Sequence, residues 1–164
     1  MLIAKVVIEG LILGFLLYLI CAIEIRNGAI GMVHLYSPEV QKRVIENGLI
    51  TAEEIKRRSV LFKSLCIPGY FIYVLLCTYL INGARGFVNG FLQMFVVLSI
   101  MNLIDRILID GYWVGYTDAW NIPGTEDLKP YINVEDKIKK WIFGTVGMAI
   151  VSAILSEIMC LILK

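Results

Sequence analysis

The sequence predicts an all-α integral membrane protein with four transmembrane helices and a short cytoplasmic helical pair between the first two. Three observations lead to this fold class. Hydrophobic residues make up 59% of the 164-residue chain and charged residues only 18%, whereas soluble domains are roughly 45–50% apolar and about 25% charged. The mean hydropathy is +0.78. Four apolar stretches also approach the ~20 residues that a helix needs to cross a bilayer.

The same composition excludes two other classes of protein. A chain this apolar cannot remain disordered in water. Lys and Arg together number 15 against 14 Asp and Glu, so the net charge of +1 leaves no basic excess for binding nucleic acid.

The four predicted spans and the polar segments between them form a single membrane domain, 1–164. The predicted spans are 2–25, 61–81, 87–109 and 141–163, and the polar segments are 26–60 and 110–140. The first span has an alternative interpretation as a cleaved signal peptide, with Cys21 as a lipid-bearing residue. It lacks an A-x-A site, and Ile20 precedes Cys21 where a small residue is normal. We therefore expect a retained helix.

The basic residues predict the orientation of the four spans. Twelve of them lie in or beside the two polar segments, and the other three are Lys5, Arg85 and Lys164. Because translocation disfavours Lys and Arg, the two long segments are predicted to be cytoplasmic and both termini to be outside.

The first polar segment carries the signals of two short helices. Ser37-Pro38-Glu39 is typical of a helix start, and Asn47-Gly48 of a helix end. Thr51 then opens a second helix, which continues into the second span and is broken or bent at Pro68. The inward-facing residues are predicted to be Val40, Val44, Ile45, Ile50, Ile55 and Leu61. A DNA-binding interpretation of this pair is disfavoured, because its basic residues sit beside the membrane, where they would meet lipid headgroups.

The second polar segment is rich in aromatic residues, including Trp113 and Trp120. These rings are predicted either to lie among the lipid headgroups as an interfacial aromatic belt or to cover a binding site at the cytoplasmic end of the helices. The segment contains Ile109-Asp110-x-x-Trp113, followed by Ile-Pro-Gly-Thr-Glu at 122–126. In these residues it resembles a group of small, uncharacterised bacterial multi-spanning membrane proteins. The resemblance implies a bacterial inner-membrane location and brings no activity with it.

The end of the third span concentrates polar residues where the membrane makes them costly. Asn102 and Asp105 share a helical face, Arg106 and Asp110 are four residues apart, and Glu24 closes the first span at a similar depth. The cluster is predicted to be either an ion-paired latch between the first and third spans or a site for a cation, a phosphate-bearing headgroup or a proton. The candidate ligand-binding residues are Glu24, Asn102, Asp105, Arg106, Asp110, Trp113 and Trp120.

The fourth span carries small residues at helical spacing, which favour close helix contacts in lipid. One row contains Ala149 and Ala153, and the next runs through Gly144, Met148, Ser152 and Ser156. We expect this span to make the tightest helix contact and to be the route to a homo-oligomer.

Recognisable catalytic and cofactor motifs do not occur. The four cysteines lie singly in apolar stretches, and His34 is the one histidine. No cofactor, catalytic residue or metal ligand is assigned. The favoured function is therefore a non-enzymatic binding or transport module for a small polar or lipidic ligand at the cytoplasmic interface. The alternatives are an enzyme acting on a lipid or isoprenoid through the acidic cluster, and an accessory subunit of a larger membrane complex.

Overall fold

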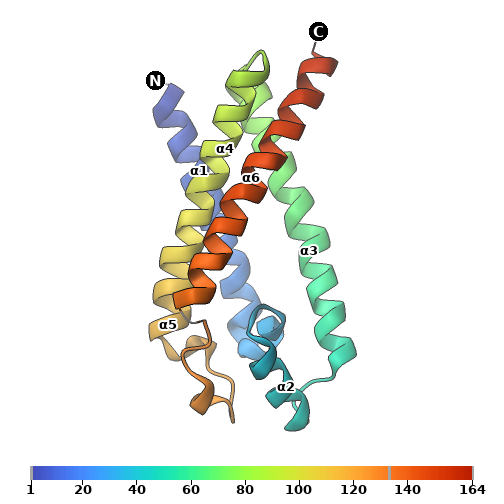
Figure 1. Ribbon diagram of the computed structural model, residues 1–164, viewed down its shortest axis with the longest axis vertical. Helices are drawn as coiled ribbons and strands as arrows, with labels where there is room; N and C mark the ends of the chain where they lie inside the picture. Colours follow the sequence, from blue (N-terminus) through green and yellow to red (C-terminus); the bar gives the residue numbers. More distant parts are fainter. Residues whose placement is uncertain (1, 133, 164) are drawn as a thin grey trace.

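The computed structural model describes residues 2–132 and 134–163, and within them it contains helices and no strand (Figure 1). Its α-helices are α1 (Leu2–Glu24), α2 (Pro38–Glu46), α3 (Ala52–Leu75), α4 (Phe87–Ile104), α5 (Val114–Tyr116) and α6 (Val134–Ile162). The short 3-10 helices are η1 (Ile25–Asn27), η2 (Ala29–Leu35), η5 (Asp118–Trp120) and η6 (Glu126–Leu128). Two π-helical segments, η3 (Leu76–Ile81) and η4 (Asp105–Trp113), extend α3 and α4.

Four continuous helical stretches are long and apolar enough to cross a membrane, which confirms the predicted fold class. They are Leu2–Asn27, Ala52–Ile81, Phe87–Tyr116 and Val134–Ile162. All four extend beyond the predicted apolar spans, because polar residues continue the same helices at one end. Of the two predicted outcomes at Pro68, a break or a bend, the break is wrong, because α3 continues through this residue.

The chain passes along the bundle four times, so both termini lie at one end and the long connections at the other (Figure 1). We call these the terminal end and the loop end. Helix α4 lies between α1 and α6 and packs along both. The η3 segment that extends α3 meets α6 at the terminal end, where the Tyr79 hydroxyl donates to Ser156 Oγ at 3.3 Å. Toward the loop end the two helices diverge in Figure 1.

Glycines set the closest approach between α1 and α4. A Cβ on Gly10 would lie 2.7 Å from Ile100 Cβ, and one on Gly14 would lie 2.3 Å from Ile104 Cδ1. A Cβ does not fit 2.7 Å from another Cβ, so Gly10 requires glycine for the two backbones to come this close, and at Gly14 a side chain would have to displace that of Ile104. The sequence analysis placed the tightest contact on the fourth span and did not anticipate this one.

The two small-residue rows of α6 behave differently. Ser152 and Ser156 are fully buried, and Ser156 Oγ donates to the Phe87 carbonyl at 2.7 Å. Ala149 and Ala153 are only half-buried. The row through Ser152 and Ser156 therefore makes the contact with α4.

The helical pair of the first connection has the predicted ends. Pro38 starts α2, Asn47 ends it, and Gly48 follows with φ +68°. Thr51 Oγ1 then accepts the Glu54 backbone N–H at 3.2 Å, as expected of an N-cap.

Two of the residues predicted to face inward on this pair do not. Val40 and Val44 are fully buried, whereas Ile45 is 39% and Leu61 59% exposed. Helix α2 packs through one narrow face, and Ile45 lies about 100° around the helix from Val44. On α3 it is Phe62, beside Leu61, that contacts His34, with ring centroids 5.3 Å apart.

The two long connections pack together as one cap over the loop end. The Tyr36 hydroxyl donates to the Trp120 carbonyl at 2.7 Å, which ties η2 to η5. Arg43 on α2 binds Asp127 on η6 at 3.1 and 3.2 Å. Residues more than eighty positions apart in the sequence are thereby held in one layer, which closes the loop end of the space between the four long helices.

Candidate functional site

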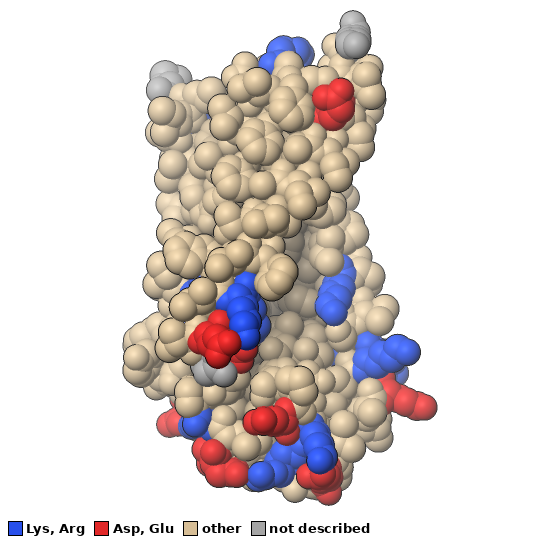
Figure 2. Space-filling view, viewed as in Figure 1, with Lys and Arg blue, Asp and Glu red and all other residues tan. Residues whose placement is uncertain are grey.

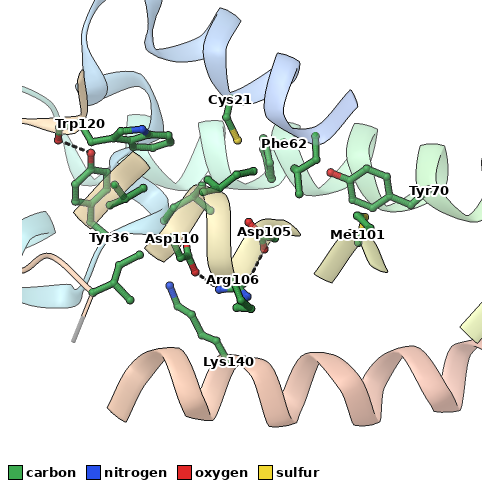
Figure 3. A pocket seen from close by; sticks show the side chains of 15 residues that line it. Cys21, Tyr36, Phe62, Tyr70, Met101, Asp105, Arg106, Asp110, Trp120 and Lys140 are labelled. Atoms are coloured by element: carbon green, nitrogen blue, oxygen red, sulfur yellow. Dashed lines mark hydrogen bonds and ion pairs between the residues drawn. The ribbon is translucent and has the colours of Figure 1, made fainter. Parts of the chain in front are cut away.

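A cavity of about 240 Å³ lies under this cap, at the loop end of the bundle (Figure 3). Side chains from all four long helices line it. Its walls are largely apolar, and they include Leu17, Cys21, Leu35, Phe62, Met101 and Ile109. The polar residues of η4 stand within this apolar surround, so the site combines charge with hydrocarbon contacts.

The charged centre of the cavity is Arg106 with a carboxylate on either side. Its Nη1 donates to Asp110 and its Nη2 to Asp105 (Figure 3). The three side chains are mostly buried, and Asp110 is 8% exposed. Ion pairs at this depth require good geometry, because charges lose their hydration on burial.

The π-helical geometry of η4 explains how one arginine reaches both carboxylates. Asp105 and Asp110 are five residues apart, which in an α-helix is a rotation of about 140° around the axis. A π-helix joins residues i and i+5 by its hydrogen bonds, so η4 brings the two carboxylates to the same side of the helix. Segments of this kind are frequent at functional sites.

All three charged groups belong to one helix, so they do not form the predicted latch between the first and third spans. Glu24, which was expected to join them, is exposed at the end of α1 and does not line the cavity. The face of α1 that does line the cavity carries Leu17 and Cys21. The physical reason lies at the end of α1: Glu24 is its last residue, and the next residue, Ile25, is the one that is buried, so the carboxylate of Glu24 lies on the exposed side.

Lys140 enters the cavity from the opposite side, on α6 (Figure 3). Its charge acts on Asp105 through space. Among the residues that the structure describes, it makes no hydrogen bond or ion pair. Lys140 is thus a cation at the cavity with its hydrogen-bond donors unused.

Three buried polar atoms in the lining make no hydrogen bond within the described chain. They are Trp120 Nε1, Arg106 Nε and the Tyr70 hydroxyl, beside which lies the Cys66 thiol, a weak partner. Trp120 is 2% exposed. A buried donor without an acceptor costs about 1–3 kcal/mol, so these atoms make the lining costly to bury.

Aromatic rings fix the cap above the charged centre. Trp113 meets Trp120 edge to face, with ring centroids 5.3 Å apart. Trp113 also packs on Tyr18 of α1, at 4.7 Å. Tyr36 packs against Trp120 at 6.2 Å, and burial raises the pKa of its phenol well above the usual range, so it remains a donor to the Trp120 carbonyl. These tryptophans therefore cover the cavity, whereas the nearby Tyr112 is 64% exposed.

The sequence-predicted residues divide into three groups. Asp105, Arg106, Asp110 and Trp120 line the cavity, and Trp113 supports Trp120 from behind. Asn102 is buried one turn deeper and its Nδ2 donates to Thr145 Oγ1 at 3.4 Å, which makes it a contact between α4 and α6. Glu24 lies outside.

The predicted site residues did not include Lys140, Tyr70 or Tyr36, which also line the cavity. Nothing in their local sequence marks them, because each reaches the cavity from a different segment of the chain.

No protein-family model, curated protein or solved structure matches the chain. Within residues 2–132 and 134–163, no group of three or more His, Cys, Asp or Glu side chains is placed to hold a metal ion. The arrangement of the cavity itself therefore carries the functional argument.

Proposed function

We propose that this protein is a non-enzymatic binding or transport module for an amphiphilic ligand at the cytoplasmic membrane interface. The observation that carries the proposal is a cavity whose walls are hydrocarbon and whose centre is the buried Asp105–Arg106–Asp110 network. A ligand with one polar and one apolar part matches such a lining, since each part finds its own kind of surface.

Access from the bilayer supports an amphiphile over a water-soluble ligand. The cavity is bordered by Phe62 and Tyr70 on α3 and by Lys140 on α6, the two helices that diverge toward the loop end. Figure 2 shows a hollow on this face of the molecule, with charged side chains beside it. Apolar residues of these two helices, such as Leu65 on α3 and Phe143 on α6, are 66% and 77% exposed and are suited to contact with lipid chains.

The charge distribution supports the orientation within the proposal. Charged side chains gather at the loop end and are sparse at the terminal end (Figure 2). With twelve of fifteen Lys and Arg in or beside the two connections, the loop end is cytoplasmic and both termini are outside. The cavity then lies at the inner leaflet of a bacterial inner membrane.

The carboxylates favour binding over the enzymatic alternative. A general base needs a carboxylate free to accept a proton from the substrate. Asp105 and Asp110 both bind the same guanidinium, that of Arg106, so neither is without a partner.

A cavity-filling variant tests the proposal. Val114 lines the cavity and is half-buried, so Val114→Trp should occupy part of the ligand's space. The wild-type chain, purified in a mild detergent, should melt at a higher temperature when a bacterial lipid extract is added, because a ligand of the folded state stabilises it. Val114→Trp should lose that shift.

The matched control is Val146→Trp, the same substitution on the exposed face of α6, where Val146 is 53% exposed. This variant should keep the wild-type shift. An equal shift in wild type and in Val114→Trp would show that lipids act on the outer surface, and the proposed function would then be wrong.

A further inference from the structure

The cavity lining contains four charged side chains, and three of them are paired with one another. Arg106 binds Oδ2 of Asp105 and Oδ2 of Asp110. The fourth is Lys140, whose ammonium makes no hydrogen bond or ion pair with the residues that the structure describes. An ammonium can only donate hydrogen bonds, so the ligand group complementary to Lys140 is an acceptor.

The two Asp and the two cations of the lining balance in charge, so net attraction does not select the ligand. Selection comes from pairing, because each carboxylate already has Arg106 as an ion-pair partner while Lys140 approaches from α6 without one (Figure 3). An anionic group would find an unused ammonium.

Lys140 stands where a lipid headgroup would meet the protein. The α6 sequence carries no charge from Trp141 to Ser156, so Lys140 is the charged residue at the edge of the apolar part of the helix. A second hollow of about 340 Å³ adjoins the cavity and shares Tyr36 and Lys140 with it. Lys140 therefore lies at the junction of the apolar cavity and a more polar recess toward the loop end.

The neighbouring lysine is engaged elsewhere. Lys139 Nζ pairs with Glu135 at 2.6 Å, and the two side chains are 60% and 75% exposed. It lines the second hollow and not the first. Lys139 therefore has an ion-pair partner, whereas Lys140 has none among the residues that the structure describes.

We infer that the ligand is a lipid with a phosphate headgroup, which enters between α3 and α6 and places its phosphate against Lys140. This inference rests on the proposed function and specifies its ligand class. A lipid is favoured over free phosphate because most of the lining is apolar and the hollow lies between two helices that span the membrane.

Tryptophan quenching measures the binding directly. The full chain in nonionic detergent micelles is titrated with phosphatidic acid or phosphatidylcholine, each carrying brominated acyl chains that quench indole fluorescence on contact. Inorganic phosphate is titrated separately, with thermal melting as the readout. We expect phosphatidic acid to quench at a concentration about tenfold lower than phosphatidylcholine, as hydrogen bonds to charged groups commonly provide.

Two lysine variants make the assignment specific. Lys140→Gln should weaken phosphatidic acid binding about tenfold and leave phosphatidylcholine unchanged, whereas Lys139→Gln, the same change one residue away, should alter either by less than about twofold. Lys140→Arg should restore binding. Melting of the variants without lipid shows whether Lys140→Gln is folded, and the restored binding in Lys140→Arg separates lost charge from lost fold.

The outcomes separate the inference from the proposed function. Equal affinity for the two lipids, or equal losses in Lys139→Gln and Lys140→Gln, would overturn the phosphate assignment. The proposed function would still stand if Val114→Trp lost the thermal shift that the lipid extract gives the wild type. If inorganic phosphate raised the melting temperature as much as phosphatidic acid does, the inference that the phosphate belongs to a lipid would be wrong. If neither lipid quenched the wild type, the proposed function would fail, and the inference with it.

Discussion

Replacing Arg106 with Gln tests the charged centre most directly. The substitution removes the one cation that binds both Asp105 and Asp110, while glutamine keeps part of the side-chain volume. Two carboxylates would then face the same cavity without the guanidinium, and Asp110 is only 8% exposed. Breaking a buried ion pair by removing one partner costs about 3–5 kcal/mol.

The expected cost translates into a large change in melting temperature. For a chain of this size, each kcal/mol corresponds to roughly 2–4 °C, so the midpoint should fall by about 6–20 °C. The assay is thermal unfolding of the purified protein in detergent, followed by intrinsic fluorescence. A second variant, Arg106→Gln with Asp110→Asn, should recover part of the loss, because it removes one of the two uncompensated charges.

The control is Arg57→Gln, the same change at an exposed position on α3. Its free energy of unfolding should stay within about 0.5 kcal/mol of wild type. If Arg106→Gln melted with the control and with the wild type, the ion pairs would contribute nothing to the fold. The electrostatic reasoning about the cavity would then be refuted.

Three further predictions concern other parts of the chain. Gly14→Leu should destabilise the protein by about 1–3 kcal/mol, because the side chain would collide with Ile104 across the α1–α4 contact; unchanged thermal melting would contradict the packing. Burial lowers the pKa of His34 below its ordinary 6.5, so the folded state favours the neutral ring. The contribution of His34 to stability should therefore be complete above pH 6.5. It should decrease as the pH falls below 6.5, because the unfolded chain binds the proton first. The melting temperature, measured between pH 5 and 8, should fall toward low pH, and His34→Gln should reduce that fall. The same pH dependence in the variant and in the wild type would exclude His34 as the cause. Single cysteines at Lys42 and Lys129, in a background without native cysteines, should resist a membrane-impermeant thiol reagent in intact cells, and labelling without lysis would reverse the orientation.

The sequence by itself determined the elements that depend on local chemistry. The number of long helices follows from hydropathy, because an apolar stretch of about 20 residues is set by the composition of that stretch alone. The bounds of α2 follow from Pro38, Asn47 and Gly48, since caps act over one or two turns. The polar cluster at the end of the third span was also visible, because a charge near a membrane is conspicuous wherever it lies.

Only the tertiary structure decided which faces of the long helices meet. In a soluble helix the buried face is apolar and the other face polar, so the sequence marks it. In α1, α4 and α6 both faces are apolar, because lipid and protein interior are similar solvents. The face of α6 that contacts α4, the position of Glu24 outside the site and the approach of Lys140 into it were therefore left open by the sequence.

The charged centre also depended on the fold. Asp105 and Asp110 lie on different sides of a regular α-helix, and η4 brings them together around Arg106 by adopting π-helical geometry. That choice of hydrogen bonding is a small local difference, which the surroundings decide. Here those surroundings are Cys21 on α1, Tyr70 on α3, Lys140 on α6 and Trp120 in the cap. They come from four segments that are distant in sequence, and only the packed bundle brings them to one cavity.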